Sequence, residues 1–153
     1  MCVILDANCF ASFRDRANQD MQPIRRWLAE KNGKIAYTDT LKFRDEWKSS
    51  GLDLRELNRA GQLRLIPRDE VLSKQAEIEE ELESDDPHVI ALAMVAGIRV
   101  LVVQRQPDEP LRGRRRRARG ADTALQRDFK RLANGSVYIT ASHRHLLTKD
   151  LCP

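Results

Sequence analysis

The chain has 153 residues, of which 41% are hydrophobic and 33% charged, and its net charge is +4; this fits one folded domain over residues 1–153. No stretch reaches the roughly 18 consecutive apolar residues that a membrane span requires, and MCVILDANCF lacks the basic region and the cleavage site of a signal peptide. The sequence therefore excludes a typical membrane protein and predicts a cytoplasmic domain.

Strands and helices alternate in the first half of the chain. Val3, Ile4 and Leu5 form an apolar run typical of a parallel strand that is buried on both faces. Polar residues follow this run at its end. The pattern then predicts a helix at 21–31, a strand at 34–37, helices at 40–49 and 53–60, and a strand at 62–66.

The second half continues the alternation, beginning with an acidic helix at 70–83. Ser84-Asp85-Asp86-Pro87 is a helix start, because Ser or Asp can cap a helix and Pro suits its first turn. The apolar helix ends at Gly97 and leads into a buried strand at 98–103. A helix followed by a strand favours a parallel sheet, so we predict an α/β fold: a three-layer α/β/α sandwich with a mainly parallel central sheet.

An Arg-rich segment then interrupts the pattern, before a helix at 122–133 and a last strand at 136–140. Residues 104–119 contain seven arginines and two acids, which gives them a charge of +5 and leaves −1 for the rest of the chain. We interpret residues 104–120 as an inserted loop that binds nucleic acid through phosphate contacts, because it offers arginine forks and no aromatic residue. The candidate binding residues are Arg112, Arg114, Arg115, Arg116, Arg117 and Arg119.

Three acids stand near predicted strand ends: Asp6, Asp86 and Asp122. Sites in open α/β sheets form beyond the carboxyl ends of strands. Crowded carboxylates repel one another unless a cation joins them, and oxygen ligands suit Mg²⁺ or Mn²⁺. Such an ion lowers the pKa of a bound water and neutralises charge on a phosphate, as hydrolysis of a phosphodiester requires.

Structural interpretations remain open for the same residues. The acid after the first strand could form a turn, the acids at helix starts could be caps, and Glu46 in KFRDEWK could be a surface charge. His88 could orient a carboxylate, although a capping or packing role is the plainer interpretation. The arginines could be solvated, or could dock on an acidic partner or on the Glu-rich helix.

Four segments resemble the PIN-domain nucleases. VILDANCF is similar to that family's first strand, and FRDEWKSSG to the segment with its second acid. SDDPHVIALA resembles the region of the third acid, and ADTALQRDF the region of the last. In order and spacing, the resemblance covers nearly the whole chain.

By position, the resemblance implies four acids that would be both metal ligands and catalytic residues: Asp6, Glu46, Asp86 and Asp122. Asn8 and Asp85 would support them. The Arg-rich segment separates Asp122 from the strand that the family's last acid usually follows closely, so Asp108 is its rival.

The family consists of Mg²⁺- or Mn²⁺-dependent endoribonucleases, many of them toxins of toxin–antitoxin pairs. The resemblance therefore implies RNA as the substrate and a cognate antitoxin as a partner. A homodimer is a further candidate assembly, and the lack of an apolar span predicts no membrane association. The alternative is a non-catalytic RNA- or protein-binding module on the same fold. Such a binder could lose all four acids without losing affinity, which separates the two hypotheses.

Overall fold

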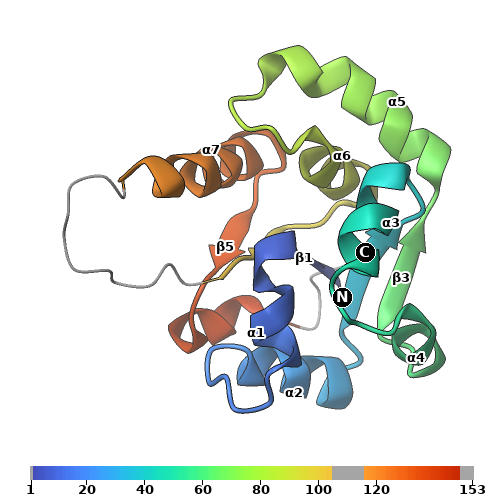
Figure 1. The fold of residues 1–153 in the computed structure, drawn as a ribbon, viewed down its shortest axis with the longest axis vertical. Helices are drawn as coiled ribbons and strands as arrows, with labels where there is room; N and C mark the ends of the chain where they lie inside the picture. Colours follow the sequence, from blue (N-terminus) through green and yellow to red (C-terminus); the bar gives the residue numbers. More distant parts are fainter. Residues whose placement is uncertain (1, 105–115, 149–153) are drawn as a thin grey trace.

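The computed structural model describes residues 2–104 and 116–148, with the backbone alone for 116–123 (Figure 1). Five parallel strands form one central sheet in the order β3-β2-β1-β4-β5. The strands are β1 (Cys2–Leu5), β2 (Lys34–Thr38), β3 (Leu63–Ile66), β4 (Val100–Val102) and β5 (Ser136–Tyr138).

The central strand β1 is buried along its whole length, as its apolar run predicts. It pairs with β2 through Cys2 and Lys34, and with β4 through Ile4 and Leu101. The chain builds outward from β1 to β3, and then returns to the other side of β1 to add β4 and β5. Ligands of open α/β sheets bind beyond the carboxyl ends of the strands at such a reversal, which here lies between β1 and β4.

Helices cover both faces of the sheet. In Figure 1, α5, α6 and α7 lie along one side of it, and α1, α2 and η4 lie along the other. The predicted three-layer α/β/α sandwich is therefore confirmed. The helices are α1 (Phe10–Arg14), α2 (Gln22–Glu30), α3 (Leu41–Lys48), α4 (Leu54–Arg59), α5 (Arg68–Ile78), α6 (Pro87–Ala96) and α7 (Arg116–Leu132), with short 3-10 helices η1 (Ala7–Cys9), η2 (Glu79–Glu81) and η4 (Ala141–Leu146).

Helix α6 is the central element on its side of the sheet. Its residues from His88 to Ala93 are all buried, because the helix packs against the sheet and against its neighbours α5 and α7. Gly97 ends α6 in the left-handed conformation with φ of 67°, and the backbone N–H of Ile98 bonds to the carbonyl of Ala93 at 2.9 Å. This fixed helix holds the backbone that directly follows Asp86.

Two elements differ from the sequence predictions. Helix α1 was not predicted, because five residues are too few for a periodic pattern to show. Helix α7 begins at Arg116 and not at 122, so the interpretation of residues 116–120 as loop is wrong. Arginine and alanine favour the helix strongly enough to extend it past Gly120.

The predicted arginine contacts fall largely outside the described part of the chain. Arg112, Arg114 and Arg115 lie outside it altogether, and only the helical backbone is described for Arg116, Arg117 and Arg119. Among the described residues, every helix is too short or too polar to cross a bilayer.

Candidate metal centre

Glu46, Asp86 and His88 come together from two helices. Helix α3 begins shortly after β2 ends, and α6 runs back toward the start of β4, so both helices begin at the carboxyl edge of the sheet. One oxygen or nitrogen atom of each residue lies within 4.8 Å of those of the other two. Among the described residues, these three side chains form a group whose oxygen and nitrogen atoms lie close enough together to hold a metal ion.

Glu46 and His88 form the innermost contact of the group. The imidazole Nε2 of His88 lies 3.0 Å from Oε1 and 3.2 Å from Oε2 of Glu46. The His88 side chain is 3% exposed and that of Glu46 is 20% exposed. Lys42, one turn earlier on α3, places its Nζ 3.9 Å from Oε1. Glu46 is thus a partly buried carboxylate with a defined partner, which argues against a plain surface charge.

Aromatic packing holds α3 in the position that makes this contact. The ring of Phe43 meets that of His88 edge-on, with 5.0 Å between the centroids. Trp47, on the same helix, packs against Tyr37 of β2 at 5.5 Å and against Phe10 of α1 at 5.0 Å. Both α3 aromatic side chains are buried, so rotation of the helix that would move Glu46 away is opposed by the core.

Asp86 occupies the N-cap position of α6, but its side chain makes no capping hydrogen bond. Only its backbone carbonyl takes part in the first turn, where it accepts from the N–H of Val89 at 3.2 Å. Burial raises the pKa of the Asp86 carboxyl; nearby His88 opposes this effect and Glu46 adds to it. The capping interpretation therefore fails for the Asp86 side chain.

Asp85 is exposed, unlike Asp86. Its negative charge is a further, smaller contribution to the raised pKa of Asp86. Its predicted supporting role stays a prediction.

Asp6 and Asn8 stand at the point where the sheet order reverses. The backbone N–H of Asp6 bonds to the carbonyl of Val102 at 2.9 Å, and the side-chain oxygen of Asn8 accepts from the N–H of Gln104 at 3.3 Å. The ends of β1 and β4 are thereby joined, and the supporting role of Asn8 at the metal stays a prediction. Asp6 lies at the predicted strand end but is not a member of the three-residue group, and its role as a ligand stays a prediction.

The fourth acid is untested. Asp122 lies within α7, six residues after its start, so the interpretation of Asp122 as an N-cap is wrong. Its side chain belongs to the part of α7 described by its backbone alone, and the rival Asp108 lies outside the described residues.

His88 is the group member that was not among the predicted site residues. His88 lies two residues after Asp86 in the sequence, which indicates a place near the acids. The local pattern does not indicate its partner Glu46, which lies 42 residues earlier. Only the packing of α3 against α6 brings the two side chains together.

The donor set suits a divalent cation. Two carboxylates fit Mg²⁺ or Mn²⁺, and an imidazole nitrogen shifts the preference toward Mn²⁺. Nε2 of His88 can hold a proton that it donates to Glu46, or use its lone pair as a ligand, but it cannot do both. His88 is therefore either an orienting partner of Glu46 or a third ligand.

No family model, no curated protein and no solved structure matches this chain. The function of the protein is therefore inferred from its residues and their arrangement.

Proposed function

We propose that this protein is a divalent-metal-dependent endoribonuclease whose metal ligands include Glu46 and Asp86. One observation carries the proposal: Asp86 points a partly buried carboxylate at the Glu46–His88 pair while making no capping bond. Two carboxylates crowded in this way destabilise each other unless a cation is bound between them. The resemblance to PIN-domain nucleases supports the same two acids and adds Asp6 and Asp122 to the proposed set.

In this proposal each group has a distinct task. Mg²⁺ or Mn²⁺ would neutralise charge on the scissile phosphate and make a bound water more acidic. Asp86 and Glu46 would hold the ion, and His88 would keep Glu46 in its orientation. The arginines of residues 112–119 would contact RNA phosphates.

The proposal extends to the location of the protein and to its partners. A cytoplasmic location is proposed together with the RNA substrate. A cognate antitoxin is proposed from the resemblance to the toxins of this family, and a homodimer is proposed as a further assembly.

The proposal is tested by incubating the purified protein with a pool of single-stranded and structured RNA in Mn²⁺ or Mg²⁺. We expect cleavage that EDTA abolishes and that Asp86→Asn and Glu46→Gln each reduce by more than about a hundredfold, beyond the 10–100-fold typical of residues that merely support ligands. The matched control is Asp45→Asn, which removes an exposed carboxylate next to Glu46 and should leave the rate unchanged.

Two other results would point elsewhere. RNA binding without cleavage, equal in wild type and in the acid variants, would favour the non-catalytic binding module. Cleavage that resists both EDTA and the substitutions would indicate a contaminating ribonuclease and would remove the support for this function.

A further inference from the structure

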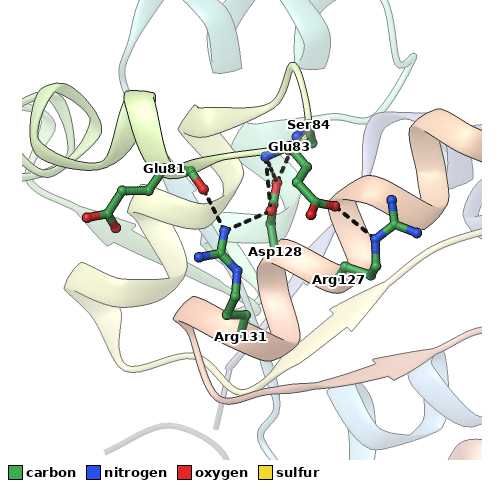
Figure 2. Close-up of polar contacts among 6 residues, drawn as sticks. All are labelled: Glu81, Glu83, Ser84, Arg127, Asp128 and Arg131. Carbon is green, nitrogen blue, oxygen red and sulfur yellow. Dashed lines mark hydrogen bonds and ion pairs between the residues drawn. The ribbon is translucent and has the colours of Figure 1, made fainter.

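Asp128 of α7 is a fully buried carboxylate, 0% exposed, at the centre of a polar cluster. Figure 2 shows the cluster, in which side chains of α7 grip the segment that connects η2 to α6. That segment ends at Asp86, two residues after Ser84. The cluster therefore acts on the stretch of backbone that carries a proposed metal ligand.

The carboxylate of Asp128 accepts hydrogen bonds from two backbone N–H groups of this segment. The N–H of Glu83 lies 3.1 Å from each of its oxygens, and the N–H of Ser84 lies 2.8 Å from Oδ2. Burial alone would raise the pKa of Asp128, but these two N–H groups, the Ser84 side chain and Arg131 outweigh it and hold the pKa below its ordinary value. Asp128 is therefore an ionised clamp on two consecutive peptide groups.

Two arginines extend the grip along the same face of α7. Nη2 of Arg131 lies 2.6 Å from the carbonyl oxygen of Glu81 and 3.3 Å from Oδ1 of Asp128. Nε of Arg127 lies 2.9 Å from Oε2 of Glu83, in a pair whose two side chains are both mainly exposed. The buried member of the cluster is the one that fixes the backbone, and the outer pair is screened by solvent.

The core already fixes α6 itself, since its residues from His88 to Ala93 are buried. The turn before α6 has no such anchor, because Glu83 and Asp85 are exposed and Ser84 and Asp86 only partly buried. A buried carboxylate contributes little net stability, because the free energy of its desolvation offsets much of the free energy gained from its hydrogen bonds. Its effect is specific: it selects one conformation of the turn.

We propose that Asp128 is a positioning residue, which holds the turn at 83–86 so that Asp86 faces Glu46 and His88, and which ties the proposed metal centre to α7. This inference rests on the proposed function. Because α7 begins within the Arg-rich segment, a movement of that helix would reach the turn before Asp86 through Asp128 and its two neighbouring arginines.

The test uses Asp128→Asn, which keeps the shape but replaces one accepting oxygen with an N–H₂ group that cannot accept. Two quantities are measured on the full chain: Mn²⁺ affinity by calorimetric titration, and amide hydrogen exchange without metal. We expect a loss of Mn²⁺ affinity of about 10–100-fold, the range found for residues that orient ligands. We also expect faster exchange at Glu83 and Ser84, with the α6 amides from Ile90 to Ala93 unchanged.

The matched control is Arg127→Gln, which removes the exposed pair with Glu83 on the same helix and should leave both quantities unchanged. Where Asp128→Asn does not fold, Arg131→Gln serves instead, because that side chain is half exposed and its loss should weaken the clamp in the same direction. A folded variant with wild-type Mn²⁺ affinity and wild-type exchange at the turn would overturn the inference.

The two proposals fail in distinguishable ways. If wild type binds no Mn²⁺, the metal centre is rejected and, with it, the role of Asp128 in that centre; the exchange data then show only a turn clamp. If wild type binds Mn²⁺ and the variant binds it equally well, the metal centre stands and the inference about Asp128 falls.

Discussion

Asp86 combines a helix-start position with a carboxyl whose pKa is raised, chiefly by burial. The folded state therefore holds its proton more tightly than the unfolded chain, in which the pKa is about 3.9. Stability should fall as pH rises from that value through the raised one, because the ionised carboxylate is a cost to the metal-free protein. A ligand that neutralises the carboxylate recovers this cost.

Asp86→Asn should separate these effects. Without metal, the loss of the charge should make the thermal stability less dependent on pH above about 4. It should not lower the midpoint temperature of thermal unfolding at pH 7. Wild type should gain about 2.7 kcal/mol from Mn²⁺ at a hundred times its Kd, and the variant should gain almost nothing. Differential scanning calorimetry with and without EDTA measures both; a midpoint that falls in the variant, or an undiminished gain with Mn²⁺, would contradict this role.

Residues of the candidate site differ in whether the local sequence could predict them. Asp86 could be predicted, because a Pro follows it and an apolar helix follows that Pro. The contact between Glu46 and His88 could not, since it spans 42 residues and depends on how α3 packs on α6. The role of Asp128 could not be predicted either, because nothing in the local pattern shows that it is buried against backbone N–H groups of a distant turn.

Among the elements, α6 is the one on which the candidate site most depends. Its start carries Asp86 and His88, and its end is set by Gly97 in the left-handed conformation. That conformation is less favourable by about 1–2 kcal/mol for an amino acid with a Cβ atom. The two ends of this helix can therefore be perturbed separately.

Gly97→Ala should destabilise the fold by about 1 kcal/mol or somewhat more and leave Mn²⁺ affinity within twofold, because position 97 lies at the end of α6 opposite the metal centre. Urea denaturation measures the first quantity and calorimetric titration the second. A large loss of metal affinity in a folded variant would show that the whole helix, and not only its first turn, positions Asp86.

Most elements could be predicted because their ends carry chemical signals. Gly97 ends α6, Pro23 marks the start of α2, and the apolar runs mark β1 and β4. The start of α7 was missed because an arginine run suggests a solvated loop, whereas arginine also has a high helix propensity. The predicted parallel sheet follows from helix–strand alternation, but the order of its strands depends on pairing between distant segments.

At the scale of the whole molecule, charge is unevenly distributed: residues 104–119 carry +5 and the remainder −1. If RNA phosphates bind there, a protein that lacks three of the arginines before α7 should release about two counterions fewer when it binds single-stranded RNA, at roughly 0.7 per phosphate contact. The helix itself is left intact by these changes.

The triple variant Arg112→Gln, Arg114→Gln, Arg115→Gln should therefore weaken RNA binding and lower the slope of log K against log salt by about 2. Binding measured by fluorescence anisotropy at several salt concentrations tests this, with circular dichroism to confirm the fold. An unchanged affinity and slope would remove these arginines from the RNA interface. A steep loss of cleavage with unchanged binding would instead assign them to the reaction itself.

The clamp between Asp128 and the turn at Glu83 and Ser84 joins residues 44 and 45 positions apart. During synthesis, the strands β1, β2 and β3 and both acids of the centre leave the ribosome well before α7 does. A nascent chain that ends before residue 128 holds Glu46 and Asp86 but lacks the side chain that sets the turn. In the proposed ribonuclease, the turn that carries Asp86 would therefore take its final conformation only after most of the protein's own messenger RNA has been translated.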